Sequence, residues 1–433
     1  APDEAGVESV RQATGRDVEP LAATQREVES ALDRVLAEIE GADDDGSDVL
    51  LLDAERLRDL ASEAPVVQFL TAAIERAVSL SASDIHFERA ERSTRLRVRV
   101  DGELLDLDPP PPALYAGLVS RIKIMARLDV GERRLPQDGR VQLQTSGRQI
   151  DVRVSILPSM HGEDVVLRIL DRGSVQLDLD ELGLSKRQRE DFRRLMRRPE
   201  GMILLTGPTG SGKTTTLYSG LKEVARPNVK VVTVEDPVEY HLDGVNQIQV
   251  RSEIGLDFAK CLRSILRHDP DIIMVGEIRD RETAAMAVQS ALTGHMVVST
   301  LHTNSAAAAF PRLLDMGVED YLIASAVVGV MAQRLVRKIC TDCLEAYDPD
   351  PALLERHGLK PGTKFHRGAG CRACLQTGYR GRTVVGELLA VDEHVHRAIL
   401  ERKGAGDIHR IARADGMQSL WDHAVEKVCV GET

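Results

Sequence analysis

Nine residues, Gly207 to Thr215, form the sequence GPTGSGKTT, which fits the pattern G-x-x-x-x-G-K-[ST]. The apolar stretch GMILLT precedes it and a helix-forming segment, KTTTLYSGLKEV, overlaps and follows it. In this context backbone N–H groups surround a β-phosphate, the lysine reaches the β and γ oxygens, and the next hydroxyl binds Mg²⁺. A glycine-rich turn without a ligand is the alternative. The predicted nucleoside triphosphate site comprises Gly207, Pro208, Thr209, Gly210, Ser211, Gly212, Lys213, Thr214 and Thr215, with Thr214 also a ligand of Mg²⁺.

A first acidic group follows the apolar run in VTVEDPVEY, Val232 to Tyr240. If this run is a strand of a parallel sheet, Glu235 and Asp236 lie at its carboxyl end, where such sheets bind ligands. A carboxylate beside a magnesium triphosphate can hold a metal-bound or attacking water. The alternative is a turn started by Asp236 before proline. We predict a catalytic role for Glu235.

A second acidic group ends the apolar run in DIIMVGEIRD, Asp271 to Asp280. At this distance after a phosphate-binding loop, such a strand usually ends in an aspartate that orders Mg²⁺, but here it ends in Gly276 and Glu277. Glu277 can accept a proton from water or orient it for in-line attack, and we predict it as the main catalytic residue. Mg²⁺ would then depend on Thr214, phosphate oxygens and water, with Glu277 and Glu235 acting through water.

Two histidines belong to the next apolar segment, LTGHMVVSTLHTN, which supplies His295 and His302. A histidine near a strand is often structural, but it can also donate a hydrogen bond to a γ-phosphate. Because this segment is the next strand of the expected sheet, we predict that at least one histidine contacts the nucleotide. His295 is assigned to nucleotide binding and His302 to catalysis.

Four of the six cysteines occur as two pairs, CTDC and CRAC, with 27 residues between them. Two CxxC pairs followed by glycine-rich turns are typical of a tetrathiolate zinc site, with redox-active pairs as the alternative. A closed site of this type has no open coordination position, so the metal is expected to fold a subdomain and not to catalyse. The predicted zinc ligands are Cys340, Cys343, Cys371 and Cys374.

The segments that must position these residues alternate between short apolar runs and helical stretches. GMILLTG, VKVVTVED, DIIMVGE and HMVVSTLHT are the runs, and together they predict a parallel sheet with helices on both faces. We expect the chain from about Ser305 to be mostly helical, interrupted by the cysteine pairs.

An α+β module is predicted before this sheet. APVVQFLTAAIERAVSL and LYAGLVSRIKIMARLD have helical patterns, whereas TRLRVRVDGELLDL and RVQLQTSGRQIDVRVSIL alternate like antiparallel hairpins, with Asp-Gly and Ser-Gly at the turns. Further upstream, TQREVESALDRVLAEIE, Thr24 to Glu40, predicts an amphipathic helix with Thr24 and Glu27 as a capping box. The following GADDDGSD predicts an acidic linker.

The charge distribution limits the classes of partner. The chain has a formal net charge of −12, and residues 1 to 60 carry 17 acidic and 6 basic side chains, so the remainder is nearly neutral. Nucleic-acid binding needs a broad positive surface, and this charge balance argues against such a surface. The absence of a run of 18 apolar residues and of a signal-peptide pattern predicts a cytoplasmic chain without direct membrane insertion.

In their order along the chain, these motifs resemble those of the secretion ATPases. GPTGSGKTT, VEDPVE, RHDPDIIMVGEIRD and TGHMVVSTLHTN resemble the Walker A motif, aspartate box, Walker B motif and histidine box of that family. The similarity extends through SASDIH, RVDGEL and SRIKIMARLDVGERRLPQDGR upstream and MGVEDYLIASAVVGVMAQRLVRKIC downstream. In this family the Walker B motif characteristically ends in Gly-Glu, with the glutamate as the proposed base. The tetracysteine motif resembles that of assembly-type members, which retraction members generally lack, and VVGVMAQRLVRKIC is similar to the type II secretion ATPases.

The resemblance implies an α/β fold: a RecA-like P-loop NTPase domain with a parallel-rich sheet, a preceding PAS-like α+β domain and a small four-cysteine zinc subdomain. The implied boundaries are 1–45 for the remnant of an amino-terminal helical domain with its acidic linker, 60–172 for the PAS-like domain, 173–183 for an interdomain linker and 184–433 for the ATPase domain, with 339–378 as the zinc subdomain.

The resemblance also implies a homo-hexamer that binds ATP, Mg²⁺ and Zn²⁺. It assigns four arginines to the approach of the phosphates, where guanidinium groups would neutralise developing charge upon domain closure. Surface arginines are the alternative for each of them. These are Arg140, Arg153, Arg263 and Arg267.

The family's partners are the cytoplasmic domain of an inner-membrane secretion protein and an inner-membrane platform protein, so peripheral recruitment to the inner membrane is expected. The implied activity is ATP hydrolysis that drives pseudopilus assembly and protein export. A type IV pilus assembly ATPase is the alternative within the family. A nucleotide-regulated scaffold and a zinc-finger nucleic-acid translocase are alternatives of other classes.

Overall fold

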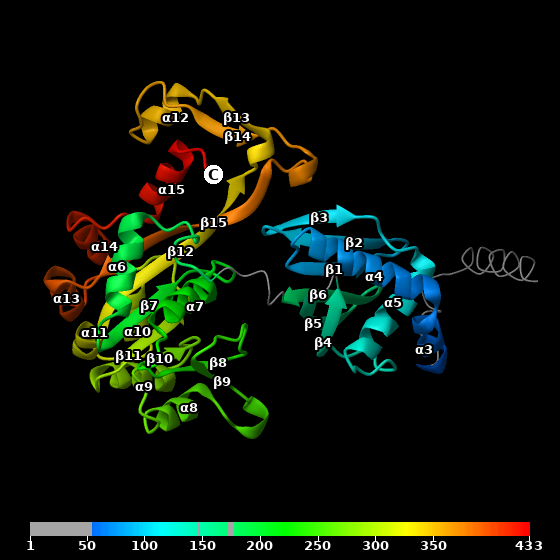
Figure 1. Ribbon diagram of the computed structural model, residues 1–433, viewed down its shortest axis with the longest axis horizontal. Helices are drawn as coiled ribbons and strands as arrows, with labels where there is room; N and C mark the ends of the chain where they lie inside the picture. Colours follow the sequence, from blue (N-terminus) through cyan, green and yellow to red (C-terminus); the bar gives the residue numbers. More distant parts are fainter. Residues whose placement is uncertain (1–53, 146–147, 171–176) are drawn as a thin grey trace, which may run out of the picture. The chain divides into compact units, whose positions relative to one another are not determined.

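The computed structural model describes residues 54–145, 148–170 and 177–433. The helix predicted over residues 24–40, the acidic linker and part of the linker predicted over residues 173–183 lie outside these ranges. The chain forms two compact units, Ala1–Ile169 and Leu170–Thr433, whose elements are labelled in Figure 1.

The first unit is a six-stranded sheet covered by helices. Its strand order is β3-β2-β1-β6-β5-β4, so the first strand lies beside the last. Both predicted hairpins are present, as β2 with β3 and as β4 with β5. The elements are α3 (Ala54–Ser62), α4 (Ala64–Ser79), β1 (Asp84–Arg89), β2 (Thr94–Val100), β3 (Glu103–Leu107), α5 (Pro112–Met125), β4 (Gln137–Thr145), β5 (Arg148–Ser159) and β6 (Gly162–Leu170).

Alternating apolar residues of this sheet pack on α4 and α5. In β5 the buried positions Ile150, Val152 and Val154 face the same core as Leu70 of α4 and Leu118 of α5. This period of two is the pattern predicted for a sheet with one buried face.

The second unit contains a seven-stranded sheet in the order β15-β12-β7-β11-β10-β8-β9. All of its strands run parallel except β15, which pairs antiparallel with β12. The strands are β7 (Gly201–Thr206), β8 (Val231–Glu235), β9 (Val245–Gln249), β10 (Ile272–Val275), β11 (Met296–Leu301), β12 (Val327–Ile339) and β15 (Tyr379–Ala390).

Helices cover both faces of this sheet. Residues of β7 divide between the faces: Met202 and Leu204 belong to one apolar core, and Ile203 and Leu205 to the other. The second of these cores is formed with α6 (Lys186–Met196) and α7 (Lys213–Val224). The first is formed with α8 (Phe258–Ile265), α9 (Arg281–Leu292), α10 (Ala309–Asp315), α11 (Asp320–Ala326), α13 (Glu393–Leu400) and α14 (Ala405–Ala414).

The chain after Ser305 differs from the prediction of a mostly helical tail. VVGVMAQRLVRKI forms β12, which pairs with β7 in the middle of the sheet, and β15 extends the sheet beyond it. A strand that is buried on both faces shows no alternation of polar and apolar residues, so its pattern does not separate it from a buried helix.

A small cysteine-containing subdomain lies at the far end of the β12 and β15 ribbons (Figure 1). It is built on a two-stranded sheet. Its elements are a 3₁₀ turn (Thr341–Cys343), β13 (Leu344–Tyr347), α12 (Pro351–Arg356), β14 (Phe365–Gly368) and a second 3₁₀ turn (Arg372–Cys374). The last helix, α15 (Leu420–Cys429), packs on β15 and contacts β14.

Within residues 54–145, 148–170 and 177–433, no helix combines the length and apolar character needed to cross a bilayer.

Candidate nucleotide-binding site

The predicted catalytic motifs converge at one edge of the parallel sheet. Strands β7, β11, β10 and β8 are consecutive in the sheet. The segments that contain Lys213, Glu235, Glu277 and His302 begin or end at the carboxyl ends of these strands. Because parallel strands present their carboxyl ends at the same edge, side chains far apart in the sequence are brought together.

The loop Gly207–Gly212 joins the fully buried strand β7 to the first turn of α7. Three of its glycines have positive φ angles, 148° at Gly207, 76° at Gly210 and 85° at Gly212. These values lie in the region that glycine adopts without steric cost, so the loop can turn its backbone towards a ligand. The N-terminus of α7 follows directly, and its N–H groups and dipole favour an anion there.

Lys213 occupies this loop in the structure. Its Nζ donates hydrogen bonds to the carbonyl oxygens of Gly207 at 2.8 Å and Pro208 at 3.0 Å. Burial lowers the pKa of Lys213, and the nearby carboxylate of Glu277 opposes that shift. The ammonium group therefore already lies at the mouth of the predicted phosphate site, held by carbonyls that a phosphate could replace.

Glu277 lies two residues beyond β10, with 14% of its side chain exposed. One carboxylate oxygen forms an ion pair with Arg279, and the other lies 3.6 Å from Nε2 of His302. Together with its electrostatic interaction with Lys213, this places Glu277, His302 and the P-loop lysine in one cluster. The carboxylate can order or deprotonate a water there once Arg279 releases it.

The structure gives a steric reason for glycine at position 276. A Cβ added to Gly276 would lie 3.3 Å from the carbonyl oxygen of Val234 and 3.4 Å from Cα of Glu235, at the end of the neighbouring strand. Both neighbours are backbone atoms of the sheet, and Gly276 N–H donates to that same Val234 oxygen at 2.8 Å. An aspartate at this position would crowd the end of β8.

A pair of threonines connects the P-loop strand to the segment after β11. Thr206, the last residue of β7, accepts a hydrogen bond from the N–H of Thr303 at 2.8 Å, and its hydroxyl lies 2.9 Å from the carbonyl oxygen of Thr303. The first residue after β11 is His302. The segment that carries this histidine is therefore fixed against the residue that precedes the P-loop.

Glu235 is enclosed in a hydrogen-bond network and is 3% exposed. Its carboxylate accepts hydrogen bonds from the hydroxyls of Thr233, at 2.6 Å, and Tyr218, and from Nε2 of Gln247 at 3.2 Å. Burial raises the pKa of Glu235, although these three donors favour the ionised form and reduce the shift. Both oxygens already have partners in this structure, and the catalytic role remains a prediction.

The raised pKa of Glu235 leads to a pH prediction. A carboxyl group whose folded-state pKa lies above its unfolded value stabilises the fold fully below the unfolded pKa, and this contribution is lost as the pH rises through the folded pKa. In Glu235→Gln, one amide oxygen can still accept from Thr233 and Gln247, and Tyr218 can accept from the amide N–H. We expect the melting temperature of Glu235→Gln to rise relative to wild type as the pH increases above the ordinary pKa of a glutamate.

Thermal unfolding followed by circular dichroism at a series of pH values measures the difference, with Glu253→Gln, an exposed glutamate of the same unit, as the control. If the melting temperatures of Glu235→Gln and wild type changed in the same way with pH, the raised pKa of Glu235 would be contradicted. The rate of ATP hydrolysis of the same variant tests the catalytic role.

His295 is not brought to the P-loop of its own subunit. It precedes β11, and the parallel register pairs Met296 with Gly201 and Leu301 with Thr206, so His295 lies at the amino edge of the sheet. From Met296 to Leu301, the ends of β11, the strand advances five residue steps, or about 17 Å, between the two edges of the sheet. Its Nδ1 instead lies 3.0 Å from the carbonyl oxygen of Ser290. The two histidines of this segment therefore have different positions, and only His302 is at the catalytic edge.

Arg263 and Arg267 lie on α8 and directly after it, both exposed. Arg263 forms an ion pair with Glu282, and Arg267 donates to the carbonyl oxygen of Arg263 at 2.7 Å. The next residue, His268, contacts Lys230 at the start of β8, which places this end of α8 near the amino edge of the sheet. The structure does not bring these arginines to the P-loop of the same subunit.

Arg140 and Arg153 are direct partners across the β4–β5 ladder of the first unit. Arg140 is exposed and Arg153 is half-buried. Directly opposed residues share a face of the sheet, and two like charges at such positions repel.

The four cysteines of the two CxxC pairs form a cluster with the dimensions of a metal site. Their Sγ atoms all lie within 4.8 Å of one another, with Cys340 to Cys371 at 3.9 Å, Cys343 to Cys374 at 3.8 Å and Cys371 to Cys374 at 3.7 Å. Four thiolates arranged tetrahedrally at metal–sulfur distances of about 2.3 Å would be separated by about 3.8 Å. The cluster can hold one tetrahedrally coordinated metal ion.

Backbone groups around the cluster favour a thiolate at Cys374. The N–H groups of Cys371 and Gly378 donate to the sulfur of Cys374 at 3.1 and 3.2 Å. Burial alone would raise the pKa of Cys374, but these donors, together with the side chains of Cys371 and Cys343, outweigh it and lower the pKa to about 6. Gly378 also passes close to Gly368, where a Cβ would lie 2.0 Å from its carbonyl oxygen, so both backbones need glycine for this approach.

One residue that contacts the P-loop is absent from the predicted site. Gln333 of β12 is fully buried, and its Nε2 donates to the carbonyl oxygen of Ser211 at 2.7 Å. It belongs to a segment that resembles the family, MGVEDYLIASAVVGVMAQRLVRKIC, but the expectation of a helical tail gave no reason to place it beside β7. If VVGVMAQRLVRKI had been assigned as a strand of the sheet, Gln333 could have been placed near the P-loop.

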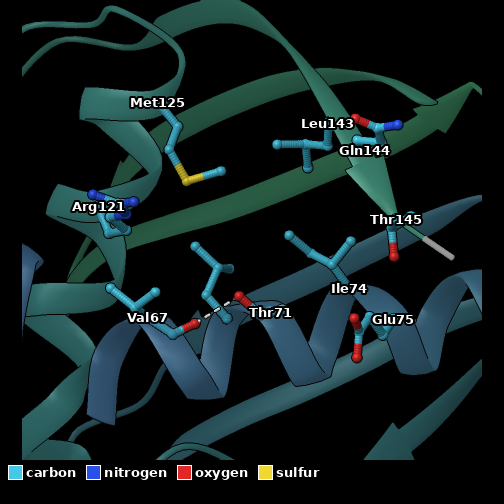
Figure 2. A pocket seen from close by; sticks show the side chains of 10 residues that line it. Val67, Thr71, Ile74, Glu75, Arg121, Met125, Leu143, Gln144 and Thr145 are labelled. Atoms are coloured by element: carbon cyan, nitrogen blue, oxygen red, sulfur yellow. Dashed lines mark hydrogen bonds between the residues drawn. The ribbon is translucent and has the colours of Figure 1, made fainter. Parts of the chain in front are cut away.

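A separate cavity of about 120 Å³ lies within the first unit, between α4, α5 and β4 (Figure 2). Apolar side chains such as Ile74, Met125 and Leu143 line it, and Glu75 and Arg121 contribute charged groups. It contains none of the P-loop, Glu277 or cysteine residues, so it is distinct from the predicted nucleotide site.

The chain is similar to a known family and to characterised proteins over most of its length. The model of the family described as "Type II/IV secretion system protein" matches residues 59–433. The chain belongs to this family. One relative is the type II secretion system protein E of Xanthomonas campestris pv. campestris, which is 47% identical over all of this chain and 78% of that protein. Another is the type II secretion system ATPase E of Vibrio cholerae, which is 47% identical over 92% of this chain and 80% of that protein.

Solved structures similar to this member of the type II/IV secretion family share its fold. The Legionella pneumophila ATPase DotB matches with a TM-score of 0.63 and 24% identity, over 84% of this chain and 92% of that one. The pilus retraction motor PilT, solved with ADP, matches with a TM-score of 0.57 and 25% identity, over 84% and 94%. At 24% identity, the similarity to DotB concerns the fold alone.

Proposed function

We propose that this chain is the ATP-hydrolysing motor of a type II secretion system, acting as a homo-hexamer to drive pseudopilus assembly and protein export. The chain is an ATP hydrolase of the type II/IV secretion family. The observation that carries the proposal is the cluster of Lys213, Glu277 and His302 at the carboxyl edge of the sheet, in a chain 47% identical to a type II secretion system ATPase. Relatives at 46–50% identity that are named for type II secretion favour this role over type IV pilus assembly.

In the proposed reaction, the P-loop N–H groups and Lys213 bind the β- and γ-phosphates, and Thr214 and phosphate oxygens bind Mg²⁺. Mg²⁺ held there would supply charge neutralisation at the phosphates. Glu277 orients or deprotonates the attacking water, and His302, beside it, donates a hydrogen bond towards the γ-phosphate. Glu235, with its network to Tyr218, fixes the end of β8 next to this carboxylate.

Four arginines would complete the site when domains or subunits close. The opposed pair Arg140 and Arg153 supplies two charges on one face, and Arg263 and Arg267 lie away from the P-loop of their own subunit. In a ring, these groups could approach nucleotide held by a neighbouring part of the assembly. Isolated chains are then expected to hydrolyse ATP slowly.

We further propose that the cysteine cluster binds Zn²⁺, because four thiolates at tetrahedral spacing match its preferred coordination. The first unit is proposed to be a PAS-like domain, and its strand order, with the first strand beside the last, supports this. Recruitment would occur at the inner membrane, through the cytoplasmic domain of an inner-membrane secretion protein and a platform protein.

The experiment that tests the function compares Mg²⁺-dependent ATP hydrolysis by wild type and Lys213→Ala at increasing protein concentration. We expect activity per chain to rise with concentration as rings assemble and Lys213→Ala to lose about a hundred-fold or more. Lys222→Ala, an exposed lysine on the same helix, is the matched control and should retain activity. ATP binding without any hydrolysis above the Lys213→Ala level would instead indicate a nucleotide-regulated scaffold.

A further inference from the structure

Strand β12 reaches the P-loop from the side opposite to β11. The register pairs Ala332 of β12 with Thr206, so the next residue, Gln333, lies level with the start of the P-loop. The carbonyl oxygen of Gln333 lies 2.5 Å from the position that a Cβ on Gly207 would occupy. Its side-chain Nε2 binds the carbonyl oxygen of Ser211 at 2.7 Å. Both ends of the loop are therefore in contact with this residue.

Arg334 continues this contact with a positive charge. Its Nη1 donates to the carbonyl oxygen of Gln333 at 3.0 Å, the same oxygen that lies against Gly207. Its Nη2 donates to the carbonyl oxygen of Asn304 at 2.9 Å. Asn304 belongs to the segment after β11 that also contains His302. The guanidinium group thus bridges β12 and this segment beside the first residue of the P-loop.

Arg334 and Lys213 are held near one another. The Nζ of Lys213 contacts the carbonyl oxygens of Gly207 and Pro208, at the same end of the loop. Burial lowers the pKa of Lys213, and the charge of Arg334 lowers it further. Two cations at the mouth of one loop repel each other, and an anion that enters the loop is attracted by both.

We propose that Arg334 is a second phosphate-binding cation, which contacts the nucleotide bound to the P-loop of its own subunit. This proposal rests on the proposed function of the P-loop. Arg334 differs from the four arginines predicted from the sequence because it needs neither domain closure nor a neighbouring subunit. Its bond to Asn304 also connects nucleotide occupancy to the segment that carries His302.

The test measures the affinity of the full chain for ATPγS with Mg²⁺ by isothermal titration calorimetry, at concentrations where the chain is monomeric. We expect Arg334→Ala to weaken binding about ten-fold, the range for losing a hydrogen bond to a charged group. Arg334→Lys keeps the charge and should stay within about three-fold of wild type. Lys338→Ala removes an exposed cation from the same strand and should bind as wild type does.

Arg334→Gln separates charge from hydrogen bonding, because it keeps an N–H donor for Asn304 without the charge. We expect it to bind as weakly as Arg334→Ala. Wild-type affinity in Arg334→Gln, or in a folded Arg334→Ala, would overturn the proposal and leave Arg334 as a structural bridge. Lys213→Ala serves as the reference for a disabled P-loop. If the wild-type chain does not bind ATPγS, the P-loop function itself is overturned. If Lys213→Ala loses ATPγS binding while the Arg334 variants keep wild-type affinity, only the role of Arg334 is overturned.

Discussion

The Glu277→Gln chain is expected to bind ATP with near wild-type affinity but to hydrolyse it about 10²- to 10⁴-fold more slowly, the range for loss of a general base. The substitution preserves the size of the side chain and its place beside His302, but it removes the charge that can accept a proton from water. Glu277 is only 14% exposed and forms part of the cluster with Lys213, so few other carboxylates can replace it.

Single-turnover hydrolysis of ATP by assembled protein, together with ATPγS binding, separates chemistry from affinity. Glu253→Gln, an exposed glutamate in the same unit, is the matched control. If Glu277 is the base, almost no hydrolysis should remain in the variant, whereas a water-orienting role would leave part of the rate because glutamine still accepts a hydrogen bond. Hydrolysis by Glu277→Gln within about three-fold of wild type would remove Glu277 from the catalytic step.

Cys374→Ser is expected to abolish metal binding and to unfold the cysteine subdomain. Structural zinc sites of this type supply about 10 to 16 kcal/mol in isolated peptides, and this subdomain has only a two-stranded sheet and short helical elements as alternative support. Cys374 has the largest number of supporting contacts, with two N–H donors on its sulfur and neighbouring sulfurs at 3.7 and 3.8 Å. The serine hydroxyl is a poorer metal ligand than a thiolate, and its Cβ–O bond is shorter than the Cβ–S bond of cysteine.

Metal content by elemental analysis should fall from one zinc per wild-type chain to none, and cobalt-substituted wild type should show thiolate-to-metal absorption that the variant lacks. Hydrogen exchange should show loss of protection in β13 and β14, with the nucleotide site less affected. Cys429→Ser, a half-buried cysteine outside the cluster, is the control. A wild-type chain without metal, or a variant that retains it, would contradict the proposed site.

Local sequence was sufficient for the P-loop and the cysteine cluster. The P-loop needs only its glycines, its lysine and the adjoining strand and helix, which are consecutive in the chain, and the structure has them in the expected elements. The two CxxC pairs are separated in sequence, but thiolates at this spacing have few other uses in such a chain. The hairpins of the first unit were also predictable, because the alternation and the turn residues occur together.

Strand assignments after Ser305 could not be predicted in the same way. The apolar run that forms β12 is buried on both faces, so it lacks the alternation that identifies a strand. This error concealed Gln333 and Arg334, which approach the P-loop only because β12 pairs with β7. Their positions beside the P-loop depend on strand order, which the local sequence does not specify.

By itself, the sequence determined which chemistry this chain carries: a phosphate-binding lysine, a carboxylate at position 277 and four thiolates. The tertiary structure decided which of these groups meet. In a parallel sheet, strand order and register set the neighbours, so His302 reaches Glu277 whereas His295, seven residues earlier, lies at the opposite edge. The same close packing of strands favours glycine at position 276, because a Cβ there would lie only 3.3 Å from a backbone oxygen at the end of β8.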